Sequence, residues 1–230
     1  MEPVVALVVA AGSGSRLGGD IPKALRVLDG RPLVSHCIEG LAAGGVDRVV
    51  IVIAPGLDDS FADVVAGSPI PAHCVHGGAE RQDSVSNGLA AIAADPQLAT
   101  ARYLLVHDAA RALVPGDLVR RVIEALLDGA VAVVPVLPVV DTIREVAAIG
   151  SATVDRNRFR VVQTPQGFAR AVLERAHRLV TDEGLQVTDD ATAVEALGYP
   201  VALVAGDRKA FKVTEPLDLL FAEAIVRSRA

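Results

Sequence analysis

The amino-acid sequence predicts an α/β protein with a mostly parallel sheet and helices on both of its faces. Short runs of β-branched and aliphatic residues alternate along the chain with longer stretches of helical composition. Most of these runs are continuously apolar, as in strands that are buried on both faces. Strands that alternate with helices usually pair in parallel, because each helix crosses over the sheet between two strands.

The predicted strands, in chain order, cover residues 4–9, 48–53, 103–107, 130–136 and 201–205. The predicted helices cover residues 32–43, 58–66, 81–94, 115–127, 170–180, 189–197 and 216–227. Proline lies in the first turn of three of these helices, and glycine follows the end of three, as is typical of helix boundaries. Thr188, Asp189 and Asp190 predict an N-cap at the helix that begins there.

One segment, residues 138–166, lacks the helical period. It contains extended pieces at residues 141–146 and 158–164 on either side of a Gly150-Ser151 turn. This pattern predicts a β-hairpin arm that projects from the sheet. Neither an internal repeat nor a stretch of linker composition interrupts the sequence. We therefore expect a single domain, residues 1–230, that carries the arm.

Composition excludes several classes of protein. The net charge is −6, aromatic residues make up 3% and tryptophan is absent, so we expect no nucleic-acid partner. No apolar run approaches the roughly 18 residues of a membrane span, and the N-terminus lacks the basic region of a signal peptide. Cys37 and Cys74 show no metal-ligand spacing and are expected to be free thiols. Together these features predict a cytoplasmic protein without a membrane partner.

A glycine-rich loop follows the first predicted strand. Its small residues allow a phosphate to approach the backbone, and they are Ala10, Ala11, Gly12 and Gly14. A dinucleotide fingerprint is disfavoured because Leu17 occupies the third glycine position, and a Walker A loop because Lys23 follows a proline. The remaining pattern, with Arg16 and a Pro-Lys pair seven residues later, is typical of nucleotidyltransferases. An ordinary tight turn between strand and helix is the alternative.

Motifs along nearly the whole chain indicate a particular family of nucleotidyltransferases. In chain order they lie at residues 10–23, 77–85, 106–111, 140–143, 163–166, 188–191 and 211–214. With these motifs the chain resembles the 2-C-methyl-D-erythritol 4-phosphate cytidylyltransferase family. The resemblance implies a Rossmann-like nucleotidyltransferase fold and transfer of a cytidylyl group from CTP to methylerythritol 4-phosphate. It also implies 4-diphosphocytidyl-2-C-methyl-D-erythritol and pyrophosphate as products, and a homodimer formed through the arm.

The resemblance also implies roles for individual residues. The predicted CTP-binding residues are Ala10, Ala11, Gly12, Gly14, Gly78, Ala79, Ser84, Asp108 and Ala109. Arg16 and Lys23 are expected to stabilise charge on the α-phosphate, the first through a fork of donors and the second as a point charge. The predicted acceptor residues are Arg111, Thr142, Thr164 and Thr188, with Arg156 and Lys212 on the acceptor phosphate.

The nucleotide base is expected to lie beside the Gly77-Gly78 pair. Glycines permit close approach to a flat base, and Ser84 offers a hydroxyl for its polar edge. Backbone C=O and N–H groups of Ala10 and Gly78 are expected to pair with cytosine. In isolation, a plain Gly-Gly turn with a surface arginine is about as common.

Asp108 ends a buried strand, where an unpaired carboxylate is costly. It is expected to contact Mg²⁺, directly or through water, or the acceptor hydroxyls, and the alternative is an N-cap for the following turn. Mg²⁺ is commonly held by substrate phosphates, so we expect the triphosphate to be its main ligand. Two rival functions remain at this stage: a cytidylyltransferase for another polyol phosphate, such as ribitol 5-phosphate, and a non-catalytic nucleotide-binding regulatory module.

Overall fold

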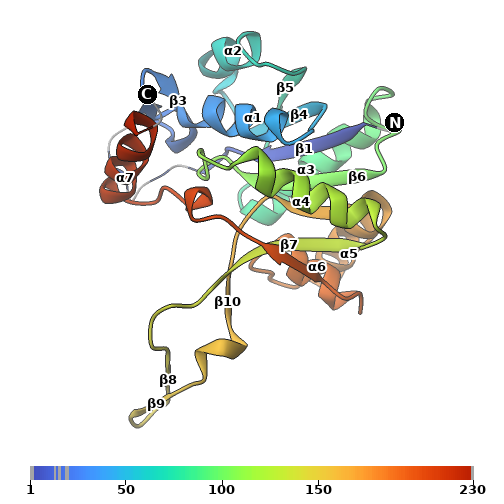
Figure 1. The fold of residues 1–230 in the computed structure, drawn as a ribbon. Helices are drawn as coiled ribbons and strands as arrows, with labels where there is room; N and C mark the ends of the chain where they lie inside the picture. The colour runs from blue at the N-terminus through green and yellow to red at the C-terminus, as the bar shows by residue number, and fades with distance from the viewer. Residues whose placement is uncertain (1–2, 13, 15–16, 19–20, 229–230) are drawn as a thin grey trace.

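A mixed, mostly parallel sheet forms the centre of the protein (Figure 1). The computed structural model describes residues 3–12, 14, 17–18 and 21–228. The strands of the sheet run in the order β10-β7-β11-β6-β1-β4-β5, and β12 also pairs with β7. They are β1 (Val4–Val9), β4 (Arg48–Ile53), β5 (Ala72–His76), β6 (Tyr103–Asp108), β7 (Ala132–Pro138), β10 (Arg160–Val162), β11 (Gln166–Ala169) and β12 (Ala202–Ala205). Only the pairings of β10 and β11 are antiparallel in this sheet.

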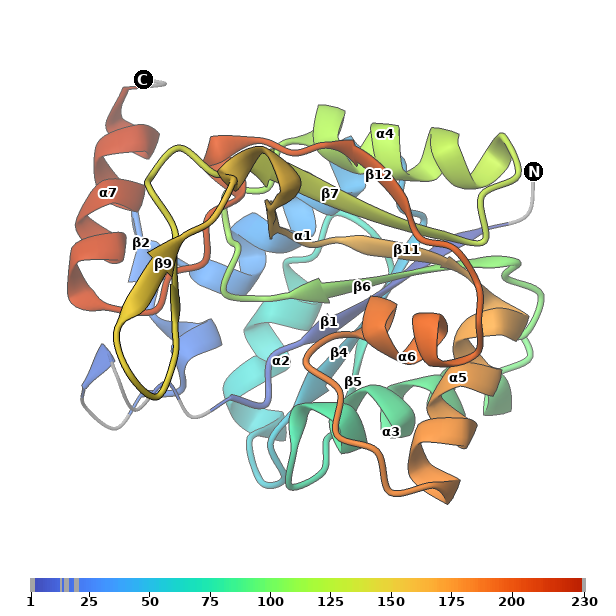
Figure 2. The ribbon, with the colours of Figure 1, turned by 90° about the horizontal axis from the view of Figure 1, so that it is seen from below.

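Helices cover both faces of the sheet, which confirms the predicted fold class (Figure 2). One apolar core packs the sheet against α1 (Leu33–Ala43), α2 (Asp58–Ala66) and α4 (Gly116–Leu127). The other packs it against α3 (Arg81–Ala94), α5 (Arg170–Asp182) and α6 (Asp190–Ala196). The last helix, α7 (Pro216–Arg227), contacts the small hairpin of β2 (Val27–Leu28) and β3 (Arg31–Pro32). Among the described residues, no helix has the length and apolarity to cross a membrane.

Element boundaries agree with the predicted ones to within a few residues. Pro32 and Pro115 are the N-cap residues of α1 and α4, one position before the helices begin. Asp189 caps α6, where its side chain accepts a hydrogen bond from the backbone N–H of Thr192. Strand β11 was not predicted, because four residues that include a glycine carry no recognisable strand pattern.

The predicted arm is present, but it is shorter than expected. Its tip is a hairpin of β8 (Arg144–Val146) and β9 (Ser151–Thr153), followed by the short 3-10 helix η3 (Arg156–Arg158). Figure 1 shows this segment extending away from the sheet. The expected end at Gln166 is wrong, because Gln166 is fully buried and begins β11 in the central sheet. The projecting part therefore lies between the end of β7 at Pro138 and the start of β10 at Arg160.

Candidate active site

A cleft of about 190 Å³ lies at the carboxyl ends of the two adjacent parallel strands β1 and β6. Their last residues, Val9 and Asp108, are register partners, so the loops that follow them emerge side by side. The structure brings most of the predicted nucleotide residues to this cleft, together with both predicted lysines. These lining residues are Ala10, Ala11, Gly12, Lys23, Gly78, Ala79, Ser84, Asp108, Ala109 and Lys212.

Gly14 of the glycine-rich loop lies against Lys23. Gly14 has a φ of +71°, and a Cβ placed there would lie 2.6 Å from the Cβ of Lys23. Only glycine combines this backbone conformation with such a close approach. Lys23 begins the short 3-10 helix η2 (Lys23–Leu25) and lines the cleft. Arg16, the other predicted phosphate-binding residue, lies outside the described residues.

Two backbone N–H groups predicted to bind cytosine already have partners inside the protein. The N–H of Ala10 donates to the carbonyl of Val52 at 2.8 Å, in continuation of the sheet. The N–H of Gly78 donates to Oγ of Ser84 at 3.2 Å, and Ser84 is 2% exposed. Ser84 thus holds the glycine turn in shape. The N–H groups of Ala10 and Gly78 are thus already engaged within the protein.

Asp108 lies between two cations. Its Oδ2 accepts from Nζ of Lys212 at 2.8 Å, and its Oδ1 lies 3.4 Å from Nε of Arg81. Burial alone would raise the pKa of this carboxyl, but the charges of Arg81 and Lys212 hold it well below its usual range. Asp108 is therefore ionised and oriented within the cleft.

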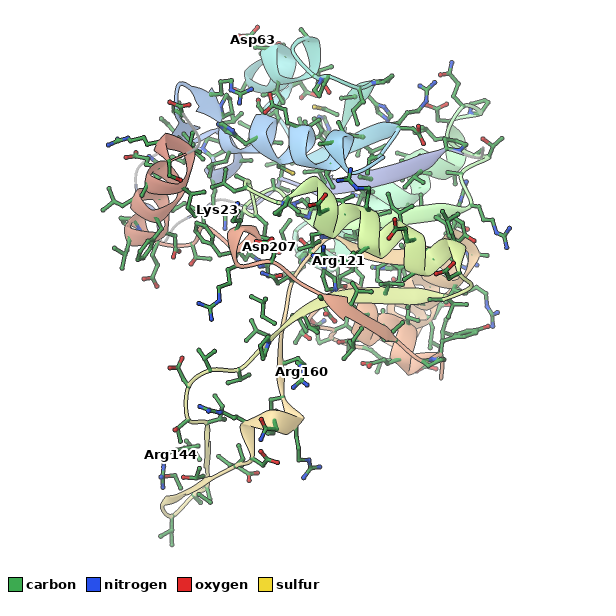
Figure 3. All side chains as sticks on the ribbon, viewed as in Figure 1. Lys23, Asp63, Arg121, Arg144, Arg160 and Asp207 are labelled. Carbon is green, nitrogen blue, oxygen red and sulfur yellow. The ribbon has the colours of Figure 1, made fainter. Side chains whose placement is uncertain are left out.

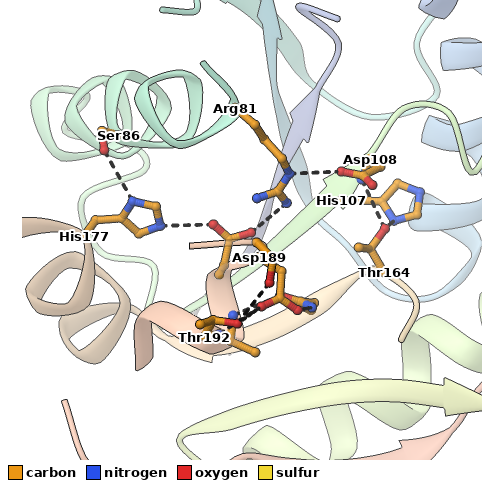
Figure 4. A network of polar contacts seen from close by, with 12 residues as sticks. Arg81, Ser86, His107, Asp108, Thr164, His177, Asp189 and Thr192 are labelled. Atoms are coloured by element: carbon orange, nitrogen blue, oxygen red, sulfur yellow. Dashed lines mark hydrogen bonds and ion pairs between the residues drawn. The ribbon is translucent and has the colours of Figure 1, made fainter. Parts of the chain in front are cut away.

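The backbone of Asp108 is held by a second set of hydrogen bonds (Figure 4). Its N–H donates to Oγ1 of Thr164 at 3.1 Å, and Thr164 Oγ1 lies 2.9 Å from Nδ1 of His107. Nε2 of His107 lies 3.3 Å from the carbonyl of Arg111. Burial is the main reason that the pKa of His107 falls to about 4, so the ring is neutral. Thr164 is 5% exposed and supports the cleft from behind.

Arg111 links three segments around the cleft. Its guanidinium donates to the carbonyl of Ala210 at 2.8 Å and to that of Val162 at 3.2 Å. Ala210 lies two residues before Lys212, and Val162 ends β10. Arg111 thus joins the end of β6 to the Lys212 segment and to the base of the arm, and its predicted contact with the acceptor stays a prediction.

The remaining predicted acceptor residues lie away from the cleft in this chain. Thr142 and Arg156 are exposed in the arm, where the Arg156 guanidinium donates to the carbonyl of Val140. In Figure 3, Arg144 of the arm lies far from Lys23. Thr188 is exposed just before α6, with its Oγ1 3.4 Å from that of Thr192. One chain therefore does not bring Thr142 and Arg156 to the cleft.

A buried polar network behind the cleft was not predicted (Figure 4). Nη2 of Arg81 donates to Oδ2 of Asp190 at 2.7 Å, and Oδ1 of Asp190 lies 3.0 Å from Nε2 of His177. Asp190 and His177 are 1% and 4% exposed. The sequence suggested an N-cap at Asp190 and, as the alternative for the Gly-Gly turn, a surface arginine. A polar residue at a helix start has the same sequence signal whether it caps the helix or pairs inside the protein.

The described residues around the cleft do not form a cage for a divalent cation. Among the described residues, no three or more histidine, cysteine, aspartate or glutamate side chains are grouped as metal ligands. Both oxygens of Asp108 face cations, and the carboxylate of Glu80 caps α3. The chain thus offers no dedicated Mg²⁺ site among the residues that the structure describes.

Comparisons with known proteins agree with one another. The family described as 2-C-methyl-D-erythritol 4-phosphate cytidylyltransferase matches residues 4–228. A protein of that name from Nocardia farcinica is 48% identical, over 99% of this chain and 95% of the relative. One from Rhodococcus jostii is 47% identical, over 99% of this chain and 97% of the relative. The crystal structure of that enzyme from Thermus thermophilus is 38% identical, with a TM-score of 0.78, and covers 99% of this chain and 100% of the solved one.

Proposed function

Because the chain belongs to the 2-C-methyl-D-erythritol 4-phosphate cytidylyltransferase family, we propose that the cleft at the ends of β1 and β6 is its catalytic site. The protein is a nucleotidyltransferase of isoprenoid biosynthesis. It transfers the cytidylyl group of CTP to 2-C-methyl-D-erythritol 4-phosphate. A phosphate oxygen of the acceptor attacks the α-phosphorus, and the bond from that phosphorus to the bridging oxygen of pyrophosphate breaks. The products are 4-diphosphocytidyl-2-C-methyl-D-erythritol and pyrophosphate.

Lys23 and Arg16 stabilise the transition state in this proposal. Negative charge grows on the α-phosphoryl oxygens and on the leaving pyrophosphate, so a fixed cation lowers the barrier more than it strengthens substrate binding. The place of Lys23 on the cleft wall, with Gly14 packed against it, supports this role. Burial would raise the pKa of the neighbouring Asp218, yet its hydrogen bonds from Thr214, with a smaller contribution from Lys23, lower it. The charge of Lys23 thus also acts on Asp218 of α7.

Lys212 and Arg156 bind the acceptor phosphate in this proposal. Lys212 is supported by its place on the cleft wall and by its 2.8 Å contact with Asp108, which keeps its ammonium at the cleft. Thr164 acts through the backbone of Asp108, which it binds at 3.1 Å. Arg111 and Thr188 complete the acceptor side.

Thr142 and Arg156 act in the cleft of a second subunit. The arm exposes large apolar side chains that its own chain does not cover, among them Val146 at 82% and Ile149 at 96%. An exposed two-stranded hairpin is marginally stable by itself, so contact with a second copy would stabilise it. A C₂ homodimer in which each arm crosses to the partner would give each site the residues that one chain lacks.

In this proposal the triphosphate of CTP, and not a dedicated site on the protein, is the main ligand of Mg²⁺. Because Asp108 already binds two cations, its contact with the ion would be single or through water. The ion supplies charge neutralisation of the leaving pyrophosphate. We also propose a cytoplasmic location, which the free thiols of Cys37 and Cys74 support.

The observation that carries the site assignment is the convergence of Lys23, Lys212 and Asp108 on one cleft beside the glycine-rich loop. Pyrophosphate release tests it, with CTP or UTP as donor and methylerythritol 4-phosphate or ribitol 5-phosphate as acceptor. Turnover should be greatest with CTP and methylerythritol 4-phosphate, and it should stop when the divalent cation is chelated. Higher turnover with ribitol 5-phosphate would show that ribitol 5-phosphate, and not methylerythritol 4-phosphate, is the preferred acceptor. Turnover without a divalent cation would remove Mg²⁺ from the proposal.

A further inference from the structure

Asp190 is a buried carboxylate that the proposed reaction does not use. It is the first residue of α6 and is 1% exposed. Its two oxygens have different partners: Oδ2 accepts from Arg81 at 2.7 Å, and Oδ1 lies 3.0 Å from Nε2 of His177. A buried ionised carboxylate without partners is strongly unfavourable, so these two contacts stabilise its charge.

The surroundings of Asp190 are rigid. Asp189 caps α6 through a 2.9 Å bond from the N–H of Thr192. The buried side chain of Gln166 bonds to both sides of this cap, at 2.6 Å to Asp189 and at 3.1 Å from the N–H of Ala191. His177, which reaches Asp190 from α5, is itself 3.3 Å from Oγ of Ser86 on α3. The carboxylate therefore has little freedom to follow its partners.

Arg81 connects this fixed carboxylate to the cleft. The Arg81 guanidinium is 2.7 Å from Asp190 but 3.4 Å from Asp108. The shorter contact is also the more deeply buried one, so Asp190 sets the position of the guanidinium. Arg81 in turn lines the cleft beside Asp108.

Asp108 has a second cation, Lys212, at 2.8 Å. The proposed function also assigns Lys212 to the acceptor phosphate. An ammonium that turns toward a phosphate weakens its contact with a neighbouring carboxylate. Once the acceptor has bound, Arg81 would be the cation left beside Asp108.

We propose that Asp190 is a positioning residue for cytidylyl transfer: it holds Arg81 beside Asp108, so that Asp108 keeps its place when Lys212 binds the acceptor phosphate. This proposal rests on the proposed roles of Asp108 and Lys212. His177 contributes by holding the second oxygen of Asp190. The residues at the cleft and the buried network of Figure 4 then act as one unit.

A double-mutant cycle on turnover tests this proposal, with Asp190→Asn, Arg81→Gln and the double variant. Asp190→Asn keeps the side-chain size and removes its charge. We expect kcat to fall about tenfold or more, while calorimetry gives the wild-type stoichiometry for CTP and a dissociation constant within about threefold. In the Arg81→Gln background, Asp190→Asn should cost less than about threefold, because it acts only through Arg81.

The matched control is Asp58→Asn, which breaks another His–Asp pair, 2.9 Å long, between exposed side chains of Asp58 and His76. Its kcat should stay within about twofold of wild type. If Asp190→Asn does not fold, His177→Phe takes its place, with a smaller loss and the same dependence on Arg81. Equal losses in both Arg81 backgrounds, loss of CTP stoichiometry in step with kcat, or wild-type turnover would each overturn the proposal. Wild-type protein that releases no pyrophosphate would instead overturn the function itself.

Discussion

The predicted site residues lie in two regions, the cleft and the arm. The two regions differ in how their side chains are packed and paired. At the cleft, Asp108 and Asp190 are buried and each has two partners. In the arm, Thr142 and Arg156 are exposed, and the apolar residues of the tip face solvent. The cleft is thus fixed by its own chain, whereas the arm lacks comparable packing.

This difference fits the proposal that each chain folds completely but shares its site with a second subunit. The phosphate side needs charges held rigidly where charge develops, which a packed sheet edge supplies. In the proposed function, the acceptor side combines Lys212 of the cleft with Thr142 and Arg156 of another subunit. Variants of the two regions should therefore fail in different ways.

The largest expected effect is in the cleft. Lys23→Ala should lower kcat by about 10²–10³-fold, as does removal of one donor that stabilises a transition state. Steady-state pyrophosphate release measures this loss. Lys209→Ala is the matched control, because Lys209 is exposed in a short 3-10 helix just before Lys212 in the sequence and does not line the cleft. Near-normal turnover of a folded Lys23→Ala protein would remove Lys23 from the mechanism.

Mixing subunits distinguishes the arm from the cleft. Arg156→Ala and Lys23→Ala homodimers should each be nearly inactive, but a mixed dimer would contain one intact site and one with both lesions. Random mixing gives about half mixed dimers, so activity should return to roughly a quarter of wild type if the sites are independent. Co-purification of differently tagged chains confirms the exchange.

The control for this mixture is Arg158→Ala, since Arg158 lies in the same short helix and is also exposed. Its homodimer should keep its activity. Confirmed mixed dimers without recovered activity would show that Arg156 serves its own subunit, whereas an active Arg156→Ala homodimer would show that Arg156 serves no site.

A smaller effect is expected for the acceptor phosphate. Lys212→Ala removes one charged contact, which is worth about 1.5–3 kcal/mol, so KM for the acceptor should rise about 10–150-fold. CTP affinity measured by calorimetry should stay within a few-fold. Equal losses for both substrates would assign Lys212 to the triphosphate instead.

The smallest expected effect is on stability, and it belongs to the cleft alone. His107 has a folded-state pKa of about 4, so only the unfolded chain takes up its proton between about pH 6.5 and 4. Stability is therefore lost as pH falls through this window. From pH 7 to pH 5, His107 should lower the free energy of unfolding by about 2 kcal/mol.

Urea unfolding of wild type and His107→Gln at both pH values measures this contribution, because glutamine does not titrate. The wild-type free energy of unfolding should fall by about 2 kcal/mol more than that of the variant. Equal falls would mean that His107 takes up its proton in the folded protein as well. Arg156→Ala changes the arm and not the cleft. Its free energy of unfolding should fall between pH 7 and pH 5 by the same amount as that of wild type.

Much of this protein is determined by local sequence. The apolar runs of β1 and β4 and the helices α2, α3 and α7 have the predicted bounds, since burial on both faces and helix caps leave local patterns. The glycine-rich loop and Lys23 were also predictable, because close approach to a phosphate restricts which residues can stand there.

Only the tertiary structure decided which polar groups pair. Arg81 and Asp190 are 109 positions apart, and Asp108 and Lys212 are 104 apart, so no local pattern links them. The occupied N–H groups of Ala10 and Gly78 follow in the same way from their neighbours in space. Residue types and spacing determine what a segment can do by itself, but the partner of a buried charge depends on which strands and helices the fold brings together, because electrostatic contacts act over a few ångströms of space and not along the chain.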